Sequence, residues 1–146
     1  MTFLLDSGIV ADLISPTPDP IILQWLDQQE EETLFISVAT LAQLSEFIAQ
    51  EPDGKEKEKH HSWLTNDLLI RFSGRFCAVT ETVAIKWGEV LAELRSLGRA
   101  LTLANSIELA IALVYGHTIV TKDITIYEDV GVKVLNPCIK KPKGII

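Results

Sequence analysis

Short apolar runs alternate along the chain with longer segments in which apolar residues recur every three or four positions. The short runs are typical of buried strands, and they cover residues 2–5, 34–37, 76–79, 118–121 and 132–135. The segments between them have the spacing of amphipathic helices. Strands that alternate with helices predict a mostly parallel central sheet of about five strands with helices on both faces. The expected fold class is therefore α/β, a three-layer α/β/α sandwich.

Several residues mark where the predicted helices begin and end. Asp19 and Thr80 each stand directly before a helical segment, where a side-chain oxygen can accept hydrogen bonds from free backbone N–H groups. Gly98 and Gly116 follow the two helical segments that precede the fourth strand, at the position where helices favour glycine. With 146 residues and no internal repeat, the chain is expected to form one domain over residues 1–146. The tail 139–146 is expected to be flexible.

Composition limits the classes of function. The sequence is 47% apolar, as expected for a globular protein, and no apolar run is long enough to cross a membrane. The N-terminus lacks a basic segment followed by a long apolar region, so we expect no secretory signal and a cytoplasmic protein. Cys77 and Cys138 are expected to be unpaired thiols. The net charge of −7 argues mildly against a phosphate-binding surface, which is normally basic, but a metal site made of carboxylates also adds negative charge.

Asp6 directly follows the first predicted strand. A carboxylate there suits a ligand site, because open parallel sheets bind ligands beyond the carboxyl ends of their strands. Asp6 is equally suited to cap a helix that begins near Gly8, and the two roles can coexist. The adjacent His60 and His61 do not share a helix face, so we expect surface histidines rather than metal ligands.

The order and spacing of six short segments resemble the PIN domains, and among them the VapC-type toxins of toxin–antitoxin pairs. Together the segments extend nearly from end to end of the chain. They are Leu4–Asp6, Leu34–Leu44, Trp87–Arg95, Leu103–Leu113, Thr118–Asp123 and Val134–Pro137.

The resemblance implies a metal-dependent endoribonuclease that uses Mg²⁺ or Mn²⁺, with acidic residues at four positions. Those positions fall on Asp6, Gln43, Asn105 and Asp123. Only Asp6 and Asp123 are acids, so they are the expected metal ligands. The asparagine that the family has two residues after its first aspartate is Gly8 here.

The two amides change the expected chemistry. Clustered carboxylates repel one another and are held together by the divalent cation that they bind. Gln43 and Asn105 keep the shape of the acids but remove two of four charges, and neither can act as a general base. We therefore expect weak or absent metal binding and weakened or lost RNA cleavage. Glu46 and Glu108 each follow one of the amides by three residues, so either could supply a carboxylate. The alternative for Glu108 is a helix-face residue paired with a lysine or arginine.

Three functions remain open on the sequence alone. The first is a toxin-type PIN protein with a degraded metal site, for which the resemblance implies RNA and a VapB-like antitoxin as partners and a homodimer as the assembly. The second is an active Mg²⁺-dependent endoribonuclease that tolerates the substitutions. The third is a small nucleotide- or flavin-binding α/β domain, against which the lack of a glycine-rich phosphate loop after any strand argues.

Overall fold

A five-stranded parallel sheet lies at the centre of the structure, a computed structural model that describes residues 1–139. The strands are arranged in the order β3-β2-β1-β4-β5. They are β1 (Phe3–Leu5), β2 (Leu34–Ser37), β3 (Phe76–Cys77), β4 (Thr118–Val120) and β5 (Val134–Leu135). Residues 140–146, on which most of the predicted flexible tail falls, lie outside the described residues.

The central strand β1 fixes the register of the sheet. Phe3 pairs with Leu34 on one side and with Thr118 on the other, and all neighbouring strands run parallel. Strands β1, β3, β4 and β5 are shorter than the predicted runs 2–5, 76–79, 118–121 and 132–135. For the edge strand β3 the cause is its only neighbour, β2, whose last residue Ser37 is already the N-cap of the next helix.

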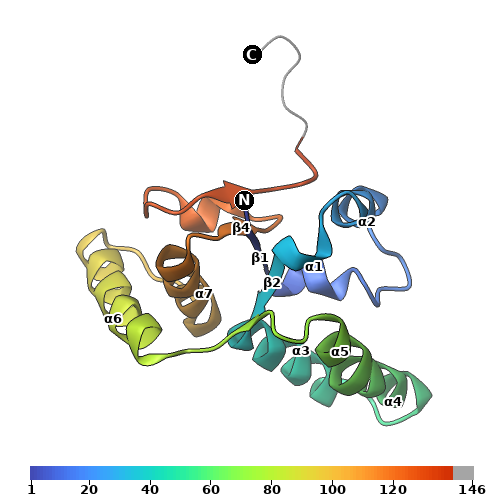
Figure 1. The fold of residues 1–146 in the computed structure, drawn as a ribbon. Coiled ribbons are helices and arrows are strands. Elements are labelled where there is room, and N and C mark those ends of the chain that lie inside the picture. The colour runs from blue at the N-terminus through green and yellow to red at the C-terminus, as the bar shows by residue number, and fades with distance from the viewer. Residues whose placement is uncertain (140–146) are drawn as a thin grey trace.

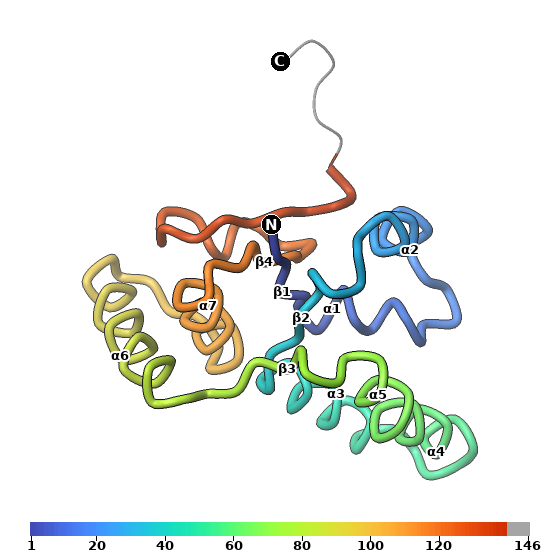
Figure 2. The backbone as a smooth tube through the Cα atoms, viewed as in Figure 1, coloured from blue at the N-terminus to red at the C-terminus, as the bar shows by residue number. Residues whose placement is uncertain are grey.

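Seven α-helices and three irregular helical segments connect the strands of the described chain (Figures 1 and 2). The α-helices are α1 (Ser7–Ala11), α2 (Pro20–Asp27), α3 (Val38–Gln50), α4 (Lys55–Ser62), α5 (Leu69–Arg71), α6 (Glu81–Ser96) and α7 (Leu103–Tyr115). The irregular segments are η1 (Glu31–Thr33) and η3 (Ile124–Tyr127), both 3₁₀, and the π-helical η2 (Trp63–Leu68). Among the described residues, no helix has the length and apolarity needed to span a bilayer.

The predicted helix ends at Asp19, Thr80 and Gly116 are confirmed. Asp19 accepts the backbone N–H of Ile21, and Thr80 accepts that of Val83. Gly116 ends α7 with φ at 71°, a left-handed conformation that glycine adopts without steric cost.

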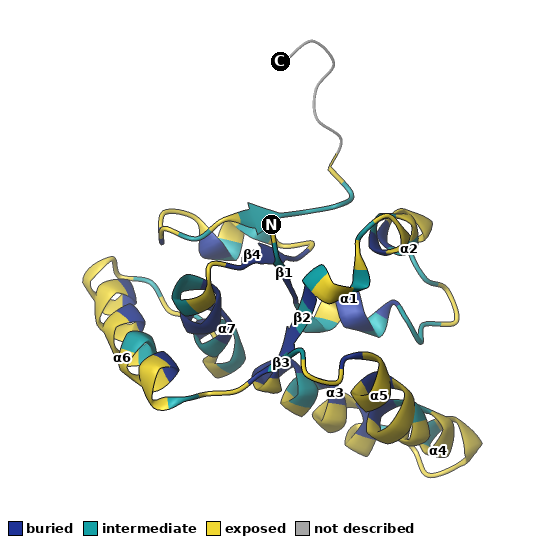
Figure 3. Cartoon of the chain, in the orientation of Figure 1, coloured by how far each residue is buried: buried dark blue, intermediate teal, exposed yellow. Residues whose placement is uncertain are grey.

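The predicted sandwich is confirmed, with α1–α5 on one side of the sheet and α6 and α7 on the other (Figure 1). Alternate side chains of β1 point to opposite faces. Phe3 and Leu5 belong to the apolar cluster under α1–α5, whereas Leu4 belongs to the cluster under α6 and α7. Figure 3 shows α7 much more buried than the outer helix α6. This placement brings side chains of α7 close to the end of the sheet.

Candidate functional site

Asp6 lies where β1 ends and α1 begins. Its backbone N–H donates to the carbonyl of Val120, 3.1 Å away, which ties it to the adjacent strand β4. Its Oδ1 accepts the N–H of Ile9 at 2.9 Å, so the predicted helix cap is present. Burial raises the pKa of Asp6, while hydrogen bonds from Thr121, Ile9 and Gly8 act against that shift. A partly buried carboxylate therefore stands at the carboxyl edge of the sheet.

Asp123 lies at the same edge, three residues beyond β4. The side chain is exposed, and its Oδ1 accepts the hydroxyl of Thr125 at 2.7 Å. Burial raises the pKa of the Tyr127 phenol, and the charges of Glu108, Asp6 and Asp123 raise it further. The two aspartates therefore act on one common side chain.

Gln43 and Asn105 lie on the two helices that face each other beside this edge. Gln43 is on α3, and it lines a groove of about 340 Å³ together with Leu103 and Ala104 of α7. Its Oε1 is buried and has no hydrogen-bond partner among residues 1–139. Asn105 is on the first turn of α7, where its backbone N–H donates to Thr102. We refer to Asp6, Gln43, Asn105 and Asp123 as the outer positions.

Glu108 is one turn further along α7 and is only 1% exposed. Its Oε1 accepts hydrogen bonds from the hydroxyls of Thr40 and Ser37, and its Oε2 accepts one from Tyr127 at 3.3 Å. Burial, together with the charge of Asp6, raises the pKa of Glu108 to about 7. The alternative of a helix-face residue paired with a lysine or arginine is wrong, because Glu108 is buried and its donors are the hydroxyls of three other elements.

An ion pair at the same edge of the sheet was not predicted from the sequence. Lys122 Nζ lies 3.1 Å from Oδ2 of Asp12, whose carboxylate is almost fully buried. The positive charge of Lys122 also lowers the pKa of Asp6, though less than the hydrogen bonds do. The sequence carried one local signal for this pair, a lysine directly before Asp123 at the end of a strand.

The donor set is poor in charge for a divalent cation. Among residues 1–139, no three His, Cys, Asp or Glu side chains lie close enough together to form a metal site. The unpartnered Oε1 of Gln43 is an acceptor that suits a hard cation, but a neutral amide is a weaker ligand than a carboxylate. The outer positions therefore do not match the four-acid centre that the resemblance implies.

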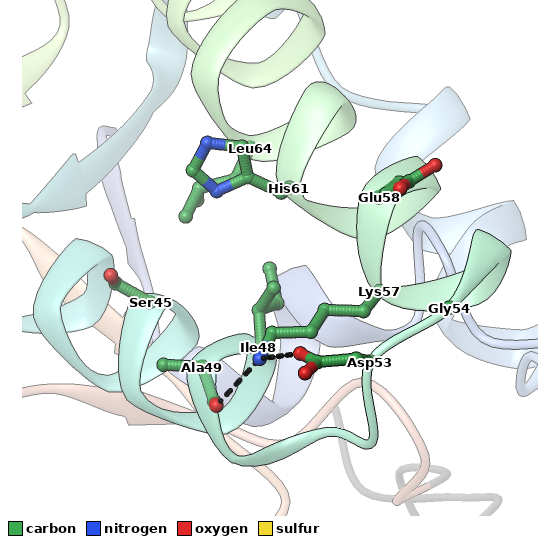
Figure 4. Close-up of a pocket in the computed structure, with 9 residues that line it drawn as sticks. All are labelled: Ser45, Ile48, Ala49, Asp53, Gly54, Lys57, Glu58, His61 and Leu64. Carbon is green, nitrogen blue, oxygen red and sulfur yellow. Dashed lines mark hydrogen bonds and ion pairs between the residues drawn. The ribbon is translucent and has the colours of Figure 1, made fainter.

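A cavity of about 480 Å³ lies elsewhere, between α3 and α4 (Figure 4). Lys57 crosses it and donates to the carbonyl of Ala49 and to Asp53, each at 3.1 Å. Ala49 is in the last turn of α3, and Asp53 and Lys57 come after that helix, whereas the outer position Gln43 is nearer its start. His61 also lines this cavity, and His60 instead bonds Glu51 at 2.7 Å. The cavity is therefore separate from the carboxyl edge.

Both the sequence and the fold are similar to those of known proteins. Residues 3–131 match the family described as PIN domain. The chain is 34% identical to the plasmid stability protein StbB of Pseudomonas syringae pv. tomato, over 92% of this chain and 96% of that protein. It is 27% identical, with the same coverage, to the VapC ribonuclease Y4jK of Sinorhizobium fredii. The crystal structure of FitAcB from Neisseria gonorrhoeae is similar, with a TM-score of 0.86 and 27% identity over 93% of this chain and 98% of that one.

Proposed function

The chain belongs to the PIN-domain family and resembles the VapC toxin ribonucleases. On that premise, we propose that it is a toxin-type PIN protein whose metal-dependent RNA cleavage is weakened or lost. One observation carries the proposal. Two of the four outer positions are the amides Gln43 and Asn105, and the buried oxygen of Gln43 has no partner within residues 1–139.

The charge deficit supports this function in physical terms. A bound Mg²⁺ or Mn²⁺ supplies an activated water and neutralises charge on the scissile phosphate. Asp6 and Asp123 are the residues that would hold such an ion, with Gln43 as a neutral ligand. The pKa of Asp6 is raised by burial, so its proton is lost less readily than that of an exposed aspartate. Weak, hydrated binding of a cation is therefore the expected behaviour.

RNA, a VapB-like antitoxin and a second copy of the chain are the proposed partners. The PIN-domain family membership and the likeness to a VapC ribonuclease support the first two. Exposed apolar side chains on the helices, among them Phe47 on α3 and Leu103 on α7, which are 61% and 68% exposed, support a homodimer built from helix faces. Sedimentation that shows only monomer at tens of micromolar would contradict the homodimer.

An RNA cleavage assay tests the proposed loss of activity. Unstructured RNA is incubated with the unmodified chain and with Asp6→Ala, each with Mg²⁺ or Mn²⁺. We expect no cleavage by the unmodified chain above the level of the Asp6→Ala control. Robust cleavage that Asp6→Ala abolishes would overturn the proposal and favour the active endoribonuclease. If Glu108→Gln then also abolished cleavage, Glu108 would be identified as the acid that replaces the lost carboxylates.

A further inference from the structure

Four buried polar side chains form a hydrogen-bonded cluster beneath the carboxyl edge of the sheet. Glu108 of α7 accepts from Ser37 at the end of β2, from Thr40 on the first turn of α3, and from Tyr127 at the end of η3. Ser37 and Thr40 are 0% exposed, and Tyr127 is 2% exposed. We call these four residues the inner network. One carboxyl group thus joins four separate elements.

Two members of the inner network are placed one helical turn from an outer position. On α3, Gln43 follows Thr40 by three residues, and on α7, Asn105 precedes Glu108 by three residues. Residues three apart on a helix lie on the same side. The contact between Thr40 and Glu108 therefore joins α3 and α7 one turn from each amide.

A third element, η3, is linked to Glu108 and directly follows Asp123. Tyr127 is the last residue of this segment. The hydroxyl of Tyr127 donates to Glu108, and burial, followed by the charges of Glu108, Asp6 and Asp123, raises the pKa of this phenol. The Tyr127–Glu108 hydrogen bond therefore attaches the segment that carries Asp123 to α7.

We propose that Glu108 is the positioning residue of this site, and that its carboxyl group holds α3, α7 and η3 in the arrangement that assembles the outer positions. The assignment of the outer positions rests on the proposed function. In a four-acid centre, the bound cation itself joins the elements that carry its ligands. Here the link is made within the protein by a buried carboxyl group and three hydroxyls.

The polarity of the inner network supports a positioning role over simple filling of the core. A buried carboxyl group costs free energy that an apolar side chain of similar volume would not. Both of its oxygens nevertheless have hydroxyl donors, and hydrogen bonds have defined directions that apolar contacts lack. The arrangement favours one geometry of the three elements, at some cost in stability.

The side-chain amides of Gln43 and Asn105 provide a direct readout, because each carries an NH₂ group with its own NMR signals. In the unmodified chain and in Glu108→Ala, the two pairs of signals are compared in ¹⁵N spectra. We expect Glu108→Ala to shift both pairs together. Glu108→Gln keeps an acceptor oxygen for Thr40 and Ser37, so its signals should stay close to those of the unmodified chain.

A matched control separates positioning from a general loss of stability. Leu94 is 3% exposed and packs in the same apolar cluster as Leu109 of α7 and Tyr127, so Leu94→Ala destabilises the same layer without removing a hydrogen bond of the inner network. Shifted Gln43 and Asn105 signals in Glu108→Ala, but not in Leu94→Ala, would support the proposal. If Glu108→Ala is too unstable for NMR, Thr40→Val and Tyr127→Phe each remove one hydroxyl and are compared in the same way.

Unchanged Gln43 and Asn105 signals in a folded Glu108→Ala, or equal shifts in Leu94→Ala, would overturn the positioning role. The measurement uses neither metal nor RNA, so its outcome does not depend on cleavage. RNA cleavage by the unmodified chain would instead contradict the proposed loss of activity. The positioning role would then still be decided by the spectra alone.

Discussion

The outer positions and the inner network differ in how the chain treats charge. At the outer positions, acids that the family resemblance implies are replaced by amides, and the buried Oε1 of Gln43 has no partner in the described chain. In the inner network, the carboxyl group of Glu108 is kept although it is 1% exposed, and each of its oxygens accepts at least one hydroxyl. Two of the four expected carboxylates are therefore missing at the outer positions, while the buried acid of the inner network has a hydroxyl donor on each oxygen.

This difference separates two tasks that one bound cation would otherwise combine. A cation both draws its ligands together and performs chemistry on a bound phosphate. The inner network can hold the elements together but offers no open carboxylate for the chemistry. Under the proposed function, such a chain keeps the arrangement of the site while its cleavage of RNA is weakened.

Restoring charge at the outer positions should have the largest effect. In Gln43→Glu with Asn105→Asp, we expect RNA cleavage dependent on Mn²⁺ or Mg²⁺, because one well-placed electrostatic group is worth roughly a hundredfold or more in rate. The assay measures the initial rate of cleavage of unstructured RNA. Gln50→Glu with Asn66→Asp is the matched control, because it makes the same chemical changes at two exposed positions. Equal rates in both double variants would contradict the role of the outer positions.

Removing the charge of the inner network should alter the dependence of stability on pH. The folded chain raises the pKa of Glu108 from an ordinary 4.5 to about 7, so folding favours the protonated acid. The contribution of Glu108 to stability should therefore be fully present below about pH 4.5 and be lost as the pH rises through 7, by at most about 3 kcal/mol. Glu108→Gln is neutral at every pH and should abolish most of this fall.

The pH experiment uses urea unfolding at pH 5 and at pH 8 on both proteins. Burial also raises the pKa of Asp6, which adds a fall in the same direction, so Asp6→Asn is included to separate the two contributions. A Glu108→Gln variant that loses stability with rising pH as steeply as the unmodified chain would show that Glu108 does not titrate in this range.

Single hydroxyls of the inner network should have smaller effects. Thr40→Val and Tyr127→Phe each leave a buried oxygen of Glu108 with one donor fewer, which typically costs about 1–3 kcal/mol. The exposed Thr65 and Tyr115 provide matched controls as Thr65→Val and Tyr115→Phe, which should change the free energy of unfolding by about 0.5 kcal/mol or less. Similar losses in the network variants and in their controls would argue against the network.

Metal-dependent stability should show the smallest effect in the unmodified chain. A ligand that binds the folded state stabilises it more the more tightly it binds. Weak binding at millimolar Mg²⁺ should therefore add less than about 0.5 kcal/mol to the free energy of unfolding. Gln43→Glu with Asn105→Asp should show a larger rise in melting temperature, because its crowded carboxylates repel until a cation binds. Strong stabilisation of the unmodified chain by Mg²⁺ would contradict the charge deficit.

The sequence by itself determined the layers of the fold, because they depend on local patterns. Apolar runs predicted the strands, and Asp19, Thr80 and Gly116 marked helix ends, since capping and left-handed turns involve residues only a few positions apart. The same local order carried the family resemblance and revealed the amides at Gln43 and Asn105. The strand lengths were less accurate, because a strand extends only as far as its neighbour supplies hydrogen-bond partners.

Only the tertiary structure decided what Glu108 does. From the sequence it was an acid in an apolar helix, either a substitute carboxylate for the site or a helix-face residue paired with a lysine or arginine. Its actual donors are separated from it by 71, 68 and 19 positions, and no local pattern records such separations. The physical reason is that the parallel sheet brings the ends of β1, β2 and β4 to one edge, where α7 packs close enough for its buried acid to meet hydroxyls from three other elements.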